Sequence, residues 1–142
     1  MAAAWTFSDA WFLEPVAGAE SAGEARLVEV IAAGDSINHA VFTPAEIEVA
    51  VNRLAAAGLL AVKDGRFSLT PEGAALRGRS PSRSVFDRIK GLEQALRRLA
   101  AADDGGWRLE EGAYAEAAAE YHRRSREAYR RLRGKPADRH RP

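Results

Sequence analysis

Apolar residues recur every three to four positions in much of this chain, which predicts a mainly helical protein. Five stretches follow this pattern: residues 8–19, 25–34, 43–58, 84–102 and 109–133. Pro15 makes the end of the first helix uncertain, because proline removes a backbone hydrogen bond inside a helix. The second helix either ends at Gly34 or continues through Ile37.

The stretch 43–58 has the clearest helix boundaries. Thr43 is a favourable N-cap, Pro44 suits the first helical position, and Glu46 has the spacing of a capping box. Gly58 is a natural C-terminal stop. The side of this helix that is expected to face the core is apolar and consists of Ile47, Ala50, Val51 and Leu54.

A different pattern follows, since apolar and polar residues alternate over residues 59–63 and again over 66–70. Asp64-Gly65 between them is a strong signal for a β-hairpin, because a type I′ turn needs positive φ at both positions. A short helix is expected over residues 70–77. The predicted fold class is therefore α+β, mainly helical, with one hairpin.

The basic, Ser/Pro-rich segment GRSPSRS (78–84) precedes the two long C-terminal helices. The first of them has a heptad-like apolar seam, which is either a dimer surface or a face packed onto the chain's own core. Its members are Val85, Ile89, Leu92, Leu96 and Leu99. The turn between the two helices is expected at DDGG (103–106). We expect a domain over residues 1–78, a helical extension over 79–133 and a flexible tail over 134–142.

The composition and the absence of known motifs exclude several classes of catalytic and metal-binding site. The 142 residues include no cysteine, which excludes disulfides and thiolate metal sites. His39, His122 and His140 lack the spacing of a metal site, and no phosphate-binding loop or nucleophile motif is present. We therefore expect no enzymatic activity, no cofactor and no metal. No stretch is apolar enough to span a membrane and no secretory signal is evident, so we expect a cytoplasmic protein.

The net charge of +1 hides an asymmetry. Residues 1–70 have four basic and nine acidic side chains, whereas residues 71–142 have seventeen basic and eleven acidic ones. The densest basic cluster lies in the last helical stretch, at Arg123, Arg124, Arg126, Arg130, Arg131 and Arg133. Such a run is either the solvated face of an amphipathic helix or a surface that contacts a polyanion beside the hairpin.

Two sequence motifs point to a known fold. The run NRLAAAGLL (52–60), followed by DGRFSLTPEG (64–73), resembles the winged helix-turn-helix domain of bacterial MarR-like and PadR-like transcription regulators over roughly residues 8–77. The two C-terminal helices resemble, in position only, the dimerisation helices of PadR-like regulators. The resemblance implies a homodimer, formed through the C-terminal helices, that binds double-stranded DNA and regulates transcription. The recognition helix would be 43–57 and the wing 59–70.

On this interpretation the candidate DNA contacts come from the outward side of the recognition helix, the wing and the basic cluster. They are Thr43, Asn52, Arg53, Lys63, Arg66, Arg123, Arg124 and Arg130. Glu46 and Glu48 depart from the pattern, because a carboxylate facing DNA repels the phosphates. The alternative is a winged-helix protein–protein interaction module that does not bind DNA. A small effector, if one exists, would lie between the extension and the winged domain.

Overall fold

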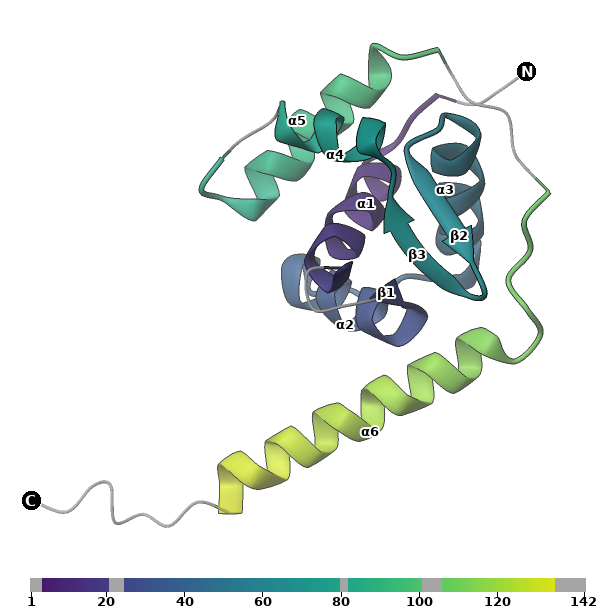
Figure 1. The fold of residues 1–142 in the computed structure, drawn as a ribbon. Coiled ribbons are helices and arrows are strands. Elements are labelled where there is room, and N and C mark those ends of the chain that lie inside the picture. The colour runs from purple at the N-terminus through teal and green to yellow at the C-terminus, as the bar shows by residue number, and fades with distance from the viewer. Residues whose placement is uncertain (1–3, 21–24, 80–81, 101–105, 135–142) are drawn as a thin grey trace, which may run out of the picture.

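The computed structural model describes residues 4–20, 25–79, 82–100 and 106–134, and every structural statement below refers to these residues. The chain is α+β and mainly helical, as the sequence predicts (Figure 1). Its elements are, in chain order, α1 (Phe7–Glu20), β1 (Ala25–Arg26), α2 (Leu27–Asn38), α3 (Pro44–Ala56), β2 (Leu60–Lys63), β3 (Arg66–Leu69), α4 (Pro71–Gly78), α5 (Val85–Arg97) and α6 (Ala113–Gly134).

Helix α1 lies at the centre of the molecule, between α2, α3, α5 and the sheet (Figure 1). Its middle is apolar on all sides: Ala10, Trp11, Phe12 and Leu13 are consecutive and all buried. A helix with this pattern is stable only when other elements surround it. The helix continues through Pro15 to Glu20. The division at residue 78 stays a prediction, although α5 shares this core.

The three strands form an antiparallel sheet in the order β1-β3-β2. The predicted hairpin is confirmed: Leu60 pairs with Leu69, and Asp64 and Gly65 adopt φ of 51° and 72° in the turn. The short strand β1 was not predicted, because its residues were assigned to the helix that follows. Only two residues form this strand, so no alternation marks it in the sequence.

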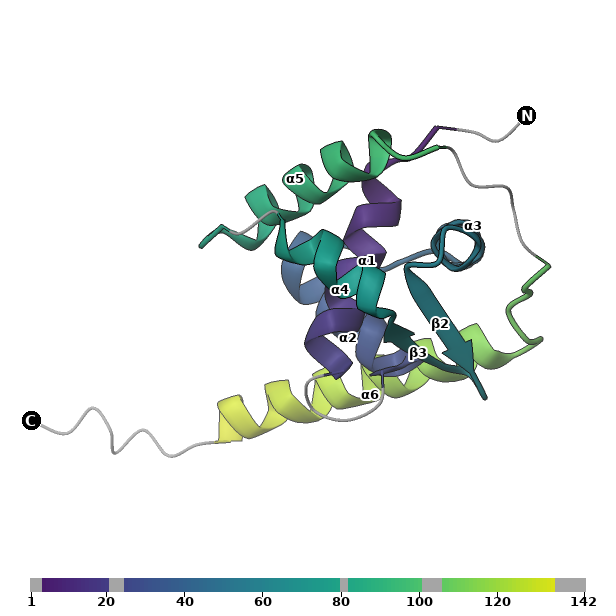
Figure 2. The same ribbon diagram turned by 45° about the horizontal axis from the view of Figure 1, so that its top comes forward.

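Helix α3 begins and ends close to the predicted residues. The capping box is present, since Glu46 N donates to Thr43 Oγ1 at 3.1 Å and Thr43 N donates to Glu46 Oε1 at 2.9 Å. Figure 2 shows α3 nearly end-on beside the hairpin, with α6 crossing the opposite part of the molecule. The predicted second helix, now α2, continues past Gly34 to Asn38.

The apolar seam of α5 packs onto the chain's own core. Ile89, Leu92 and Leu96 are fully buried and belong to the same cluster as the side chains of α1. For these three side chains packing within the chain is therefore the alternative observed, and they are not available as a dimer surface. Leu99, the last member of the predicted seam, lies beyond the end of α5 and is 38% exposed. A homodimer stays a prediction.

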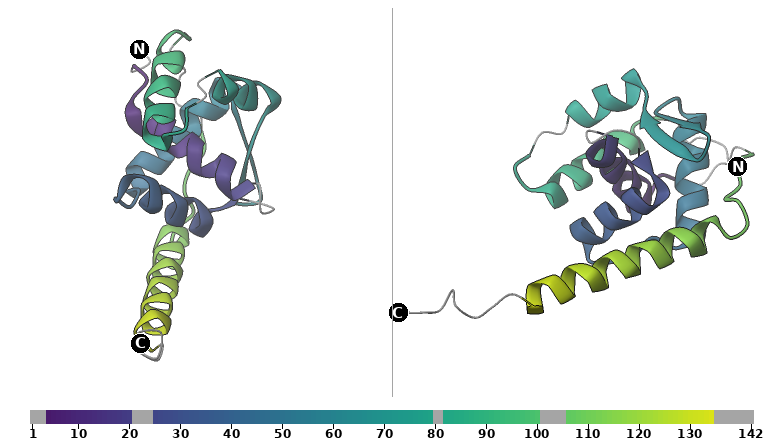
Figure 3. Two further views of the ribbon diagram at one scale, coloured as in Figure 1. Left: turned by 90° about the vertical axis from the view of Figure 1, so that its left-hand side faces the viewer. Right: turned by 60° about the horizontal axis from the view of Figure 1, so that its bottom comes forward.

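Helix α6 starts at Ala113, four residues later than predicted, and extends to Gly134. Its N-terminal half packs against α2, whereas its C-terminal half projects away from the core (Figures 1 and 3). Most of the predicted turn at 103–106 and nearly all of the tail at 134–142 lie outside the described residues. None of the helices in the described ranges is long and apolar enough to cross a membrane.

Candidate nucleic-acid interface

Arg53 of α3 points into the core, although the sequence analysis placed it on the outward side of the helix. Its Nη1 donates to Asp9 Oδ2 at 2.9 Å, and only 3% of the residue is exposed. The guanidinium also lies over the ring of Trp5, 5.9 Å from the ring centroid. The predicted outward orientation of Arg53 is wrong, because the buried carboxylate on α1 needs a cation there.

Asn52 is also buried, and its partner is a segment that we call the strap, residues 106–112. The Asn52 side chain pairs with the main chain of Trp107 in both directions: Nδ2 donates to Trp107 O and Oδ1 accepts from Trp107 N, both at 2.8 Å. Nδ2 also donates to Glu48 O at 2.8 Å. The prediction that Asn52 faces outward to read a base is therefore wrong, because its amide is occupied by the strap.

Glu48, one of the two acidic residues that depart from the expected DNA-binding pattern, has a structural partner as well. Its Oε1 accepts a hydrogen bond from Leu109 N at 2.9 Å, two residues along the strap from the Asn52 contact. Asn52 and Glu48 are four residues apart and so lie on one side of α3. The strap covers this side of the helix.

The part of α3 that remains exposed has no basic side chain in the described structure. It includes Thr43, Ala45 and Val49, the last of which is 42% exposed. Thr43 stays on the surface as predicted, but its hydroxyl is engaged in the capping box. Glu46 accepts a further hydrogen bond from Ser8 Oγ at 3.0 Å. The helix that the resemblance assigns to base recognition therefore presents small, apolar and acidic side chains.

The wing places Lys63 and Arg66 where the sequence predicts them. They are opposite each other at the end of the hairpin, on either side of the Asp64-Gly65 turn, and both are exposed. Cross-strand neighbours at a hairpin end are held close together. The wing tip therefore presents two adjacent cations to solvent.

Helix α6 is attached by polar contacts along one face to α2 and to the loop between α2 and α3. The Tyr114 hydroxyl donates to Phe42 O at 2.7 Å, and the Tyr121 hydroxyl donates to Asp35 Oδ2. This second hydrogen bond is the main reason why the pKa of Tyr121 is raised. Ala117 is buried between the two tyrosines against α2. These contacts fix which side of α6 faces the core and which side faces solvent.

The basic residues of α6 divide into those with acidic partners and those without. Arg124 lies between Glu29 and Glu120, with an N–O distance of 3.3 Å to each. Arg123 pairs with Glu127 at 3.3 Å and more loosely with Glu120 at 3.7 Å. Both were predicted DNA contacts, and both have part of their charge balanced within the chain.

Three arginines of the projecting half form what we call the arginine face: Arg126, Arg130 and Arg133. Their spacing of four and three residues places them on one side of the helix, opposite the side that packs on α2. All three are exposed, and none has an acidic partner within the described ranges. Of these, the expected DNA contacts included only Arg130. The wing lies near the N-terminal end of α6, so this face is not beside the wing as expected (Figure 1).

The described residues contain no group of three or more His, Asp or Glu side chains that could hold a metal ion.

Comparison with known proteins adds no relative, because no family model, no curated protein and no solved structure matches the chain.

Proposed function

We propose that this chain is a winged-helix DNA-binding protein that holds duplex DNA by its phosphates, through the arginine face of α6 and the wing. The element order from α1 to β3 and the sheet order β1-β3-β2 support a winged helix. The resemblance of residues 52–73 to MarR-like and PadR-like regulators supports a role in transcription regulation.

The observation on which the proposal depends is the unbalanced charge of the projecting helix. Residues 121–134 include six arginines and one glutamate. Two of these arginines, Arg123 and Arg124, have acidic partners, whereas the other four have none in the described structure. An exposed helix with this excess of positive charge attracts a polyanion and is disfavoured beside like charge. At about 1.5 Å per residue, α6 is roughly 33 Å long, which is comparable with one turn of duplex DNA.

The proposal differs from the expected mode of recognition in the role of α3. Because Asn52 and Arg53 are engaged inside the chain, they supply no base contacts in this arrangement. Contacts to phosphates position a protein on DNA but do not read its sequence. We therefore expect binding with little sequence preference and a strong dependence on salt.

Fluorescence anisotropy of a labelled mixed-sequence duplex, titrated with the full chain at several salt concentrations, tests the proposal. The logarithm of the association constant should fall linearly with the logarithm of salt concentration. The slope of this line should be about −0.9 for each phosphate contacted. Absence of binding at low salt would contradict DNA binding.

One observation favours the alternative of a protein–protein interaction module. The exposed surface of α3 combines Ala45 and the exposed Val49 with acidic neighbours and no cation in the described structure. Such a surface suits a protein partner better than a phosphate backbone. If the anisotropy titration shows no binding, affinity capture with the wild type and with a Val49→Asp variant tests this alternative, which predicts a partner that only the wild type retains.

A further inference from the structure

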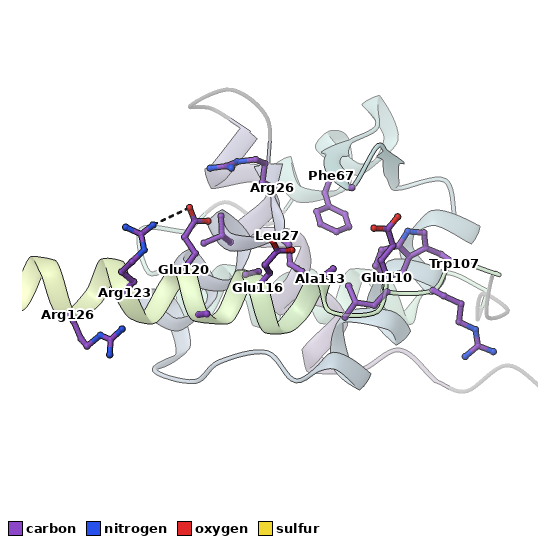
Figure 4. A pocket seen from close by; sticks show the side chains of 16 residues that line it. Arg26, Leu27, Phe67, Trp107, Glu110, Ala113, Glu116, Glu120, Arg123 and Arg126 are labelled. Carbon is purple, nitrogen blue, oxygen red and sulfur yellow. Dashed lines mark ion pairs between the residues drawn. The ribbon is translucent and has the colours of Figure 1, made fainter.

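A cleft of about 760 Å³ lies between α6, the strap and the edge of the sheet (Figure 4). Its apolar lining includes Leu27, Phe67, Trp107 and Leu109. The rings of Phe67 and Trp107 are 6.1 Å apart, with an interplanar angle of 70°. Small-molecule sites have cavities of similar size, with an apolar lining and a few placed polar groups.

The polar groups that remain unpaired in the cleft include two carboxylates. Glu110 and Glu116 extend toward its interior (Figure 4), and neither has an ion-pair partner in the described part of the chain. Glu120, the third lining acid, is paired with Arg123 and Arg124. The cleft therefore combines an aromatic wall with two carboxylates that are free to accept a ligand's hydrogen bonds.

Most of the arginines that line the cleft are engaged or directed elsewhere. Arg26 Nη2 lies 2.7 Å from Glu29 Oε1, and Arg123 is paired with Glu120 and Glu127. Arg126 extends from the other side of α6 (Figure 4). Arg108, an exposed residue of the strap, is the remaining cation of the lining. Replacing Arg108 by a neutral residue therefore tests whether the bound ligand is positively or negatively charged.

We propose that this cleft binds a small organic cation with an aromatic or apolar body. The cationic nitrogen donates to Glu110 and Glu116, and the body packs on Trp107 and Leu27. Positive charge beside an aromatic face is favourable, and it is more so where carboxylates share the site. The proposal rests on the cleft alone and holds whether or not the chain binds DNA.

The test uses ¹⁵N-labelled protein and follows the indole N–H signal of Trp107, assigned by its loss in Trp107→Phe. The probe is benzylamine, which is protonated at pH 7, with benzyl alcohol and benzoate as the neutral and anionic analogues. We expect a saturable shift with benzylamine at millimolar concentrations and at least tenfold weaker binding of both analogues. Equal binding of benzyl alcohol, tighter binding of benzoate, or no saturable shift would overturn the proposal.

Charge variants separate the site from a general effect of net charge. The double variant Glu110→Gln/Glu116→Gln should weaken benzylamine binding at least tenfold, whereas Glu72→Gln/Asp87→Asn, with the same change of charge on α4 and α5, should leave it unchanged. Arg108→Gln should strengthen it. Unaltered binding in the first variant, or weaker binding in Arg108→Gln, would contradict the assignment. Circular dichroism confirms that each variant is folded.

Discussion

Arg53 of α3 and Asp9 of α1 form an ion pair inside the core, with an N–O distance of 2.9 Å and side chains that are 4% and 1% exposed. The pair joins two helices that are 44 residues apart in the sequence. Asp9 Oδ2 also accepts from the backbone N–H of Thr6 at 2.8 Å, which fixes the carboxylate at the start of α1. A residue that the sequence suggested for DNA binding thus has a structural role.

Truncation of this pair should reduce stability strongly. Arg53→Ala leaves the Asp9 carboxylate buried without its cation, which typically costs about 3–5 kcal/mol. Urea unfolding followed by circular dichroism measures the loss, with Arg131→Ala as an exposed control expected to change stability by less than about 0.5 kcal/mol. A stable Arg53→Ala protein with weakened DNA binding would show that Arg53 is a DNA contact after all.

Removal of the Asn52 side chain should release the strap. Asn52→Ala loses three hydrogen bonds, each contributing about 1 kcal/mol, and leaves the Trp107 amide without its acceptor. Hydrogen exchange of the Trp107 amide should accelerate, whereas the amides within α2 should be unaffected. Unchanged exchange at Trp107 would mean that packing of its side chain, and not Asn52, holds the strap.

The attachment of α6 to α2 should weaken at high pH. The pKa of Tyr121 is raised above its ordinary value of 10.0, chiefly by the hydrogen bond to Asp35. A raised pKa in the folded state means that the contribution to stability is complete below pH 10 and is lost as pH rises through the raised pKa.

The difference in unfolding free energy between the wild type and Tyr121→Phe reports this contribution. It should be constant from neutral pH to about pH 9 and should decrease at higher pH. Tyr114→Phe serves as a comparison, because the Tyr114 hydroxyl donates to the Phe42 carbonyl and not to a carboxylate. If this difference in unfolding free energy stays constant as Tyr121 titrates, the hydrogen bond from Tyr121 to Asp35 does not contribute to stability.

The seam of α5 gives a prediction about stability and assembly. Leu92→Ala should lower the free energy of unfolding by about 2–5 kcal/mol, because it opens a cavity in the chain's own core. Its oligomeric state, measured by sedimentation, should match that of the wild type. If the variant dissociates a wild-type dimer without loss of monomer stability, the seam has the intermolecular role that the structure argues against.

Local signals in the sequence predicted much of the fold. The Thr43 capping box and the Asp64-Gly65 turn depend on residues within three or four positions of one another, so their geometry is encoded locally. The partners of Arg53 and Asn52 are 44 and 55 residues away. Hydrophobic periodicity does not reveal contacts between residues so far apart in the sequence. Once the apolar positions of the expected helix 43–57 were assigned to the core, Arg53 and Asn52 were assigned to its outward side.

The candidate site was predictable only in part. The basic cluster of the last helix is evident in the sequence, but the acidic partners of Arg124 come from both α6 and the distant α2. Only the structure therefore distinguishes Arg124, which has acidic partners, from Arg126 and Arg130, which have none in the described ranges. The cleft was equally hidden, because its lining comes from β3, the strap and α6, which meet only in the folded chain. One residue did give a signal: Asp9, an acid next to a continuous apolar run, anticipates a buried charge that needs a partner.

The central claim is that DNA is held by the arginine face of α6. The most direct measurement is the salt dependence of duplex binding by Arg126→Gln/Arg130→Gln/Arg133→Gln, compared with Arg79→Gln/Lys90→Gln/Arg98→Gln. The second variant removes equal charge from exposed sites on α5 and directly after the C-terminal ends of α4 and α5. We predict that the first variant weakens binding and reduces the log–log slope by about 2.7, while the second leaves the slope close to that of the wild type. Equal losses in the two variants would contradict the claim, because binding would then follow net charge and not this face of the helix.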